Sequence, residues 1–233
     1  MQSRPRNPFT LLLLILAGES VFFLPFVLPR VFRPTLLSAF DMTNLKLGTA
    51  FSAYGVVAFA SYFFGGPLAD RFPARTLIGL SLGLTGLGGF ILAVDPGFVV
   101  LIALYAFWGF STIFLLWAAM IRATREWGGT GFQGRAFGFL ESGRGLTSAV
   151  IGSLALLAFS ALTSQFTAGD NVPIHEVIFF SSVLVILIGV AVFFWMPKNL
   201  GARAAQAHKI APAEVLELLR NPTIWLQGAI IVC

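Results

Sequence analysis

Six long apolar runs, separated by short polar connections, constrain the fold of this chain more than any other feature. The runs cover residues 9–29, 46–69, 76–94, 98–121, 136–162 and 174–196. A helix needs about 20 apolar residues to cross a hydrocarbon core of about 30 Å. Only 11% of the residues are charged, against about 25% in an ordinary soluble domain. We therefore expect an all-α membrane protein with six transmembrane helices.

The polar connections set the expected domain boundaries. Residues 1–197 would form the six-helix bundle, with kinks at Pro25 and Pro29 in the first helix. Residues 198–220 would form a polar loop on the inner side, with a short surface helix at 212–220. Residues 221–233 open another apolar run that is about half as long as a span requires. We expect this run to be the incomplete start of a seventh helix.

The distribution of basic residues predicts the orientation. With the N-terminus inside, eleven Lys and Arg fall in inner segments, while only Arg30, Arg33 and Lys46 fall in outer ones. This bias fits the positive-inside rule and places the N-terminus in the cytoplasm and the chain in the inner (plasma) membrane. The net charge of +5 is thereby explained by orientation, and no nucleic-acid partner is expected.

Neither a cofactor nor enzyme chemistry is indicated. The chain has one cysteine, Cys233, and two histidines that lie outside the apolar centres, so we expect no metal site. An intramembrane serine protease would need a histidine inside a span, and an aspartyl protease would need two membrane aspartates. Asp70, Asp95 and Asp170 all lie in connections, so neither protease class fits.

The connection between the second and third runs, residues 65–75, carries the most distinctive polar pattern. It resembles the signature loop between helices 2 and 3 of the major facilitator superfamily, in which three residues separate Gly from Asp-Arg and a basic pair follows. Four residues match this pattern: Gly66, Asp70, Arg71 and Arg75. Pro73 stands where the family usually has Gly, and Thr76 stands where it usually has a second basic residue. The resemblance implies that this stretch gates access to a solute site.

The resemblance also implies an architecture and a function. Such transporters have two six-helix halves, each built from two three-helix repeats, and bind solute near the midplane between the halves. The chain would be the N-terminal half of a secondary transporter that works by alternating access, with membrane lipid, a small solute and a missing C-terminal six-helix half as partners.

The expected solute is a small organic anion, again by resemblance. The connection at residues 121–138 is similar to that of organic-anion members, including the organophosphate:phosphate antiporters. Drug:proton antiporters usually have an Arg in helix 4 where this chain has Tyr105, and a Gly-Pro motif in helix 5 that is absent here. Arg30 lies further out than the helix-1 Arg of the organophosphate antiporters. An exporter of uncharged or cationic compounds, and a non-transporting receptor or scaffold, remain as alternatives.

Charged residues inside the apolar runs are the candidate solute-binding residues. Glu19 lies near the middle of the first run, roughly 16 Å deep, and an intramembrane carboxyl is a functional candidate by default. Arg30 follows three turns later on the same face. Glu141 and Arg144 share a face of the fifth run and can pair. Arg144 lies roughly 12 Å inside if that helix begins at Ala136, or at the inner interface if the span begins at Gly145.

Aromatic residues complete the candidate site. Tyr105 and Trp108 lie on one face of the fourth run. Aromatic residues at helical spacing pack between helices more often than they bind a ligand, so both roles stay open. The predicted solute-binding set is therefore Glu19, Arg30, Tyr105, Trp108, Glu141 and Arg144.

Overall fold

The computed structural model describes residues 7–163, 174–198, 200 and 222. The predicted surface helix at 212–220 and the seventh apolar run at 223–233 lie outside these residues. The chain divides into two compact units, Met1–Ala202 and Arg203–Cys233, and the helical bundle belongs to the first. The described part of this unit is helical and contains no strand.

The first span is a helix with a break in its hydrogen-bond ladder. It consists of α1 (Pro8–Phe22), the π-helical segment η1 (Phe23–Val27) and α2 (Leu28–Val31). The Asn7 side chain caps α1 by accepting a hydrogen bond from the Phe9 amide at 2.9 Å. Pro25 has no N–H to donate and lies inside η1, so the kink predicted there takes the form of a π-helical turn.

The remaining helices follow the predicted runs closely. The predicted outer connection contains α3 (Arg33–Ala39). The other spans are α4 (Asn44–Arg71), α5 (Ala74–Ala93), α6 (Phe98–Gly109) with η2 (Phe110–Trp117) and α7 (Ala118–Gly128), α8 (Gln133–Thr163) and α9 (Ile174–Trp195).

The predicted polar loop at residues 122–135 is wrong at both ends. The fourth span continues as α7 to Gly128 and ends where Gly129 adopts a φ of 62°, a value that glycine tolerates at little cost. The fifth begins at Gln133, so only a tight turn joins them. Polarity alone suggested a loop, but α7 is amphipathic and its charged face extends the helix beyond the apolar core.

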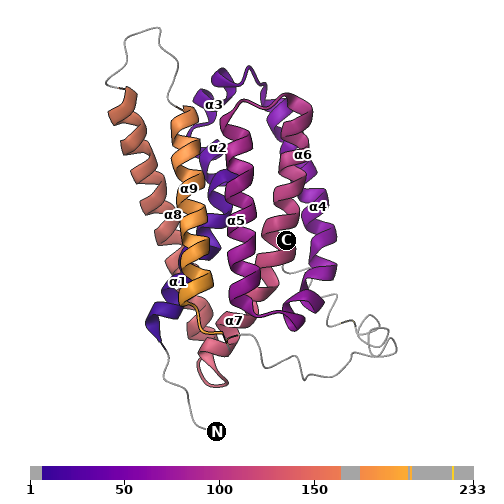
Figure 1. Cartoon of the computed structure of the whole chain (residues 1–233), viewed down its shortest axis with the longest axis vertical. Helices are drawn as coiled ribbons and strands as arrows, with labels where there is room; N and C mark the ends of the chain where they lie inside the picture. Colours follow the sequence, from indigo (N-terminus) through magenta and orange to yellow (C-terminus); the bar gives the residue numbers. More distant parts are fainter. Residues whose placement is uncertain (1–6, 164–173, 199, 201–221, 223–233) are drawn as a thin grey trace. The chain divides into compact units, whose positions relative to one another are not determined.

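Three helix pairs pack together in the bundle: α4 with α6, α1 with α8, and α5 with α9 (Figure 1). Counted as spans, these are the second with the fourth, the first with the fifth, and the third with the sixth. If spans one, two and three are exchanged with spans four, five and six, the contact between the second and fourth spans becomes the contact between the fifth and first. The contact between the third and sixth spans maps onto itself. The packing therefore has the internal symmetry expected of two three-helix repeats.

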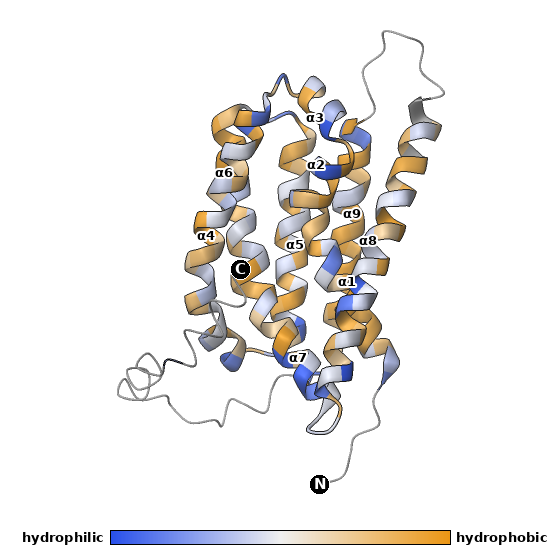
Figure 2. Ribbon diagram, turned by 180° about the vertical axis from the view of Figure 1, so that it is seen from behind, coloured by the Kyte–Doolittle hydropathy of each residue, from blue (hydrophilic) through white to orange (hydrophobic). Residues whose placement is uncertain are grey.

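The apolar surface of the bundle fits a bilayer. Six helices of the described residues are long and apolar enough to cross a membrane. Hydrophobic residues dominate the middle of the helices, and hydrophilic ones gather toward their ends (Figure 2). Large side chains such as Leu45, Val56 and Phe64 are exposed, as is normal for a surface that lipid covers. The prediction of six spans is confirmed.

Glycine permits a close helix crossing between α4 and α6. A Cβ atom at Gly109 of α6 would lie 2.5 Å from the Tyr54 carbonyl oxygen and 3.2 Å from the Ala58 nitrogen of α4. No backbone can yield by that much without displacing a helix. Gly109 thus fixes the second and fourth spans in close contact.

Candidate functional site

The candidate site lies where α1 crosses α8. Two glycines face the opposite helix at this crossing. A Cβ atom at Gly18 of α1 would lie 3.1 Å from Arg144 Cδ, and one at Gly143 of α8 would lie 2.5 Å from Ile15 Cδ1. Their small size brings the two backbones together. As a result, the side chain of Arg144 lies directly over the backbone of α1.

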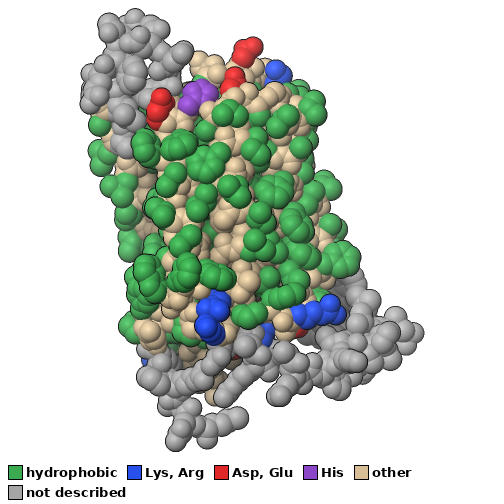
Figure 3. Space-filling view, in the orientation of Figure 1, with side chains coloured by type: hydrophobic (Ala, Val, Ile, Leu, Met, Phe, Trp, Pro, Cys, Tyr) green, Lys and Arg blue, Asp and Glu red, His purple; other side chains and the backbone are tan. Residues whose placement is uncertain are grey.

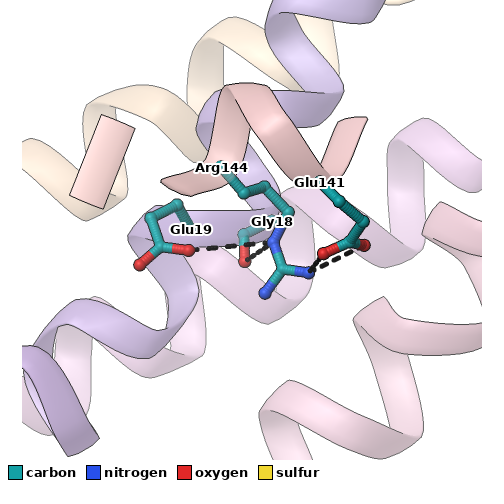
Figure 4. Close-up of polar contacts among 4 residues, drawn as sticks. All are labelled: Gly18, Glu19, Glu141 and Arg144. Carbon is teal, nitrogen blue, oxygen red and sulfur yellow. Dashed lines mark hydrogen bonds and ion pairs between the residues drawn. The ribbon is translucent and has the colours of Figure 1, made fainter. Parts of the chain in front are cut away.

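Arg144 binds two carboxylates and one carbonyl (Figure 4). Its Nε donates to the Gly18 carbonyl at 3.2 Å and lies 3.7 Å from Glu19 Oε2. Its Nη1 donates to both oxygens of Glu141, at 3.1 and 2.9 Å. Within the described residues, the polar contacts of Arg144 thus use Nε and Nη1 only. The third nitrogen, Nη2, is available to a further acceptor.

Burial separates the two carboxylates. The side chains of Arg144 and Glu19 are 14% and 13% exposed, whereas that of Glu141 is 61% exposed. Glu19 therefore holds the guanidinium from the protein side, and Glu141 approaches it from the open side. A ligand that enters from the open side would meet Glu141 first.

Two aromatic rings flank the guanidinium. Its central carbon lies 5.8 Å from the ring centroid of Phe22 and 5.4 Å from that of Trp117. The two rings also contact each other edge to face, at 6.1 Å between centroids. Cation–π contacts of this kind hold the plane of an arginine as well as its charge. Phe22 and Trp117 carry no distinctive signal in the sequence, because aromatic residues are frequent throughout the runs.

The depth of Arg144 follows from its partners. Gly18 and Glu19 lie at the middle of the first span, Pro8–Val31. A side chain that contacts both lies near the middle of the bilayer if that span crosses it. This geometry favours the placement of Arg144 inside the membrane over the placement at the inner interface.

Both π-helical segments of the described residues adjoin this site. Phe22 immediately precedes η1, and Trp117 is the last residue of η2. The two segments occupy the first and the fourth spans, which are equivalent positions in the two three-helix repeats. Insertions of this kind are often found at functional sites, and interrupted helices at matching repeat positions are a marker of solute sites in transporters.

Neighbouring side chains bond carbonyls at these two segments. The Tyr105 hydroxyl donates to the Pro25 carbonyl at 3.2 Å, and the Ser81 hydroxyl donates to the Ser111 carbonyl at 2.6 Å. Hydrogen bonds of this kind make an interrupted helix tolerable inside a membrane.

Tyr105 and Trp108 lie deep between helices. They are 1% and 0% exposed, and Trp108 Nε1 donates to the Thr85 carbonyl at 3.0 Å. Their rings pack edge to face at 5.1 Å. No contact between either ring and Arg144 is present among the described residues, so their burial points to a packing role. Arg30 is exposed at the end of α2 and likewise stands apart from the Arg144 cluster.

The predicted gating stretch is mostly helical. α4 continues through Arg71, and only Phe72 and Pro73 separate it from α5. A Cβ atom at Gly66 would have no heavy atom within 4 Å, whereas one at Gly65 would lie 3.2 Å from the Phe114 carbonyl oxygen. The neighbouring glycine is therefore the one that packs.

Asp70 pairs with Arg122 of α7. Their closest atoms, Asp70 Oδ1 and Arg122 Nη1, lie 3.5 Å apart, and Arg122 also donates to the Ala69 carbonyl and contacts Glu126 at 3.3 Å. Arg122 is 12% exposed and Asp70 is 58% exposed. Sequence reasoning placed Arg122 in a loop and so missed it as the partner of Asp70.

Among the described residues, the other two basic residues of the stretch do not join this pair. Arg71 is exposed, and Arg75 donates to the Phe193 carbonyl of α9 at 3.4 Å.

The fold agrees with comparisons to known proteins. The family model described as Major Facilitator Superfamily matches residues 5–233. This chain belongs to the major facilitator superfamily. Members of this family are in general transporters rather than enzymes.

Relatives place the chain in the inner membrane. It is 30% identical to "Inner membrane protein YihN" of Escherichia coli (strain K12), over 92% of this chain and 50% of the relative. It is 27% identical to "Inner membrane protein YqcE" of the same organism, over 97% of this chain and 53% of the relative. A Mycoplasma pneumoniae protein, the "MG294 homolog", is 23% identical over 92% and 49%. The chain thus spans about half the length of the curated relatives it matches.

Proposed function

We propose that this chain is the N-terminal half of a secondary transporter that moves a small organic anion by alternating access. The observation that carries the proposal is the position of Arg144. It lies at the middle of the bundle, its guanidinium is oriented by Gly18, Glu19 and two aromatic rings, and Nη2 is available to an acceptor. An arginine in the interior of a membrane protein marks a solute or ion pathway by default.

The chemistry of the guanidinium explains the choice of an anion. Arginine binds carboxylates, sulfonates and phosphates through two parallel charge-assisted hydrogen bonds. Glu141 already contacts the guanidinium from the open side, where both of its oxygens accept from Nη1. In the proposed mechanism the solute anion displaces the carboxylate of Glu141 and bonds Nη1 and Nη2. Glu19 and the Gly18 carbonyl continue to hold Nε, so the guanidinium keeps its orientation.

The latch between Asp70 and Arg122 accounts for gating in this proposal. It joins the end of the second span to the end of the fourth on the side predicted to be cytoplasmic. We propose that the contact between Asp70 and Arg122 forms when the solute site is closed to that side. The contact breaks when the site becomes accessible from that side. The N-terminus would be cytoplasmic, as the distribution of Lys and Arg predicts.

A second candidate function has one specific observation in its favour. Glu19, Glu141 and Arg144 sum to one negative charge when all three are ionised, and Phe22 and Trp117 lie beside them. Carboxylates and aromatic rings together suit a cationic solute. In that case Arg144 would only balance the carboxylates, and replacing it would not remove solute binding.

The test is a ligand panel on the complete protein, including the second half that its relatives carry. Small carboxylates, sulfonates, phosphates, amines and sugars are scored by their effect on thermal unfolding, because a bound ligand stabilises by mass action. The anion proposal expects a hit among the acids that is lost in Arg144→Ala. A hit among the amines that survives in Arg144→Ala would favour the second candidate. No hit in any class would support a receptor or scaffold that does not bind small solutes.

A further inference from the structure

A groove lined by apolar side chains runs along the outer surface where α5 packs against α9. It has a volume of about 370 Å³. Five of its lining residues carry the argument: Thr76, Gly83, Leu87, Gly189 and Phe193. Thr76 and Leu87 are eleven residues apart on α5, which is roughly 16 Å at 1.5 Å per residue. That length is about half of a hydrocarbon core of about 30 Å, so the groove extends over one leaflet.

The glycines in this groove have two different roles. A Cβ atom at Gly79 would lie 3.1 Å from the Gly189 carbonyl oxygen, and one at Gly189 would lie 2.9 Å from Leu82 Cβ. These two glycines allow α5 and α9 to cross. A Cβ atom at Gly83 would have no heavy atom within 4 Å. Gly83 is therefore not needed for the crossing, and its missing side chain keeps the groove open.

Positive charge gathers at one end of the groove. The Arg75 guanidinium lies 5.4 Å from the ring centroid of Phe193, and its Nη1 bonds the Phe193 carbonyl at 3.4 Å. Its Nε is buried and lacks a hydrogen-bond partner among the described residues. The first turn of α5 begins at Ala74, and Pro73 provides no side-chain cap. An arginine and an uncapped helix N-terminus together favour an anion at this point.

The space-filling view of this face shows the same division. Hydrophobic side chains cover its middle, Lys and Arg predominate at the lower end, and Asp and Glu predominate at the upper end, where a basic side chain is also visible (Figure 3). Lys198 is exposed three residues after the end of α9, so a second basic residue follows this helix. A molecule that fits this surface is apolar along one leaflet and carries a negative charge at the basic side.

We propose that the groove between α5 and α9 binds an anionic phospholipid in the leaflet on the side of Arg75. One acyl chain lies along Gly83 toward Leu87. The phosphate lies beside the Arg75 guanidinium and accepts hydrogen bonds from it and from the first amides of α5. A second copy of this chain in the same membrane would bring its own Arg75 to the same level, where like charges oppose the contact. A zwitterionic lipid fills the groove but gains less from the basic end.

Native mass spectrometry of the complete protein, purified in detergent, tests this proposal. The probes are dioleoyl phosphatidylglycerol and dioleoyl phosphatidylcholine at equal concentration. The wild-type chain should retain one phosphatidylglycerol in preference to phosphatidylcholine. Arg75→Gln should reduce the retention of phosphatidylglycerol about fivefold, as expected for one basic residue at a lipid surface. Gly83→Leu should reduce retention of both lipids, because leucine fills the groove without a clash.

Two controls match these variants. Arg135 also lies over a phenylalanine ring, at 5.5 Å from the centroid of Phe132, but on α8. Arg135→Gln should leave lipid retention unchanged. Gly55 of α4 is exposed and a Cβ atom there would have no heavy atom within 4 Å, so Gly55→Leu should also change nothing.

Three outcomes would overturn the proposal. The first is that the wild type retains the two lipids equally. The second is that Arg75→Gln and Arg135→Gln lose lipid retention to the same extent. The third is that the wild type forms a dimer that Gly83→Leu abolishes. The last would show that a second chain, and not a lipid, covers the groove. Because the readout is lipid retention, it is independent of the solute that Arg144 is proposed to bind.

Discussion

Arg144 of α8 donates a hydrogen bond to the carbonyl of Gly18 of α1, 3.2 Å away. The two residues are 126 positions apart in the sequence. This contact fixes the depth of the guanidinium at the middle of the first span and ties the first helix of the bundle to the fifth. The groups around the guanidinium therefore decide how strongly an anion can bind there.

Replacing Glu141 should strengthen the binding of an anion. Glu141 is 61% exposed and competes for Nη1 of Arg144. Glu141→Gln removes the competing charge, so the affinity for the acid identified in the ligand panel should rise severalfold, equivalent to about 1 kcal/mol for a largely exposed pair. Glu176→Gln, a carboxylate in the first turn of α9, is the control. A lower affinity in Glu141→Gln would show that this carboxylate takes part in binding.

The latch predicts a separation of transport from stability. Asp70→Asn in the complete protein should lower uptake, since the contact with Arg122 is lost. The free energy of unfolding should fall by less than about 1 kcal/mol, because Asp70 is 58% exposed. Asp95→Asn is the control, since Asp95 is also exposed but lies in the turn between α5 and α6. Wild-type uptake by Asp70→Asn would remove the gating role.

The crossing of α4 and α6 predicts opposite effects at two glycines. Gly109→Ala should lower the free energy of unfolding by about 1–3 kcal/mol, because its Cβ would meet the α4 backbone. Gly48→Ala should leave stability unchanged or raise it by up to about 1 kcal/mol, because space is available and alanine favours helix. Thermal unfolding in detergent measures both. Equal effects would contradict the crossing.

The orientation predicts which turns are accessible from outside. A cysteine at Asp95, in the turn between α5 and α6, should react with an impermeant reagent on intact cells. A cysteine at Gly131, in the turn between α7 and α8, should react only after the cells are permeabilised. Both are placed in a Cys233→Ser background, because Cys233 is the chain's one cysteine. The reverse pattern would place the N-terminus outside.

Much of the fold was predictable because a bilayer demands long apolar runs. Run length alone predicted the six spans. Errors arose only where a polar segment is helical in the structure, as at residues 122–128. The π-helical form of the break at Pro25 and the segment at Phe110–Trp117 were not predictable. They depend on hydrogen bonds from side chains on other helices, such as Tyr105 to Pro25.

The site was predictable in part. Glu19, Glu141 and Arg144 stood out because charge inside a span is costly, and the structure brings these three together. Whether they bind solute stays a prediction. The role of Phe22, Trp117 and Arg122 depends on contacts between helices far apart in the sequence. The sequence alone does not show which of the chain's many aromatic and basic residues make these contacts.

The most direct test of the proposed site is Arg144→Lys in the complete protein, with binding of the panel's best acid measured by titration. Lysine keeps the positive charge but cannot form two parallel bonds to an oxyanion. The affinity should fall by about tenfold or more, as expected for the loss of one charge-assisted hydrogen bond, while thermal unfolding without ligand stays close to wild type. An affinity equal to that of the wild type in both Arg144→Lys and Arg144→Ala would contradict the proposal that Arg144 binds the solute.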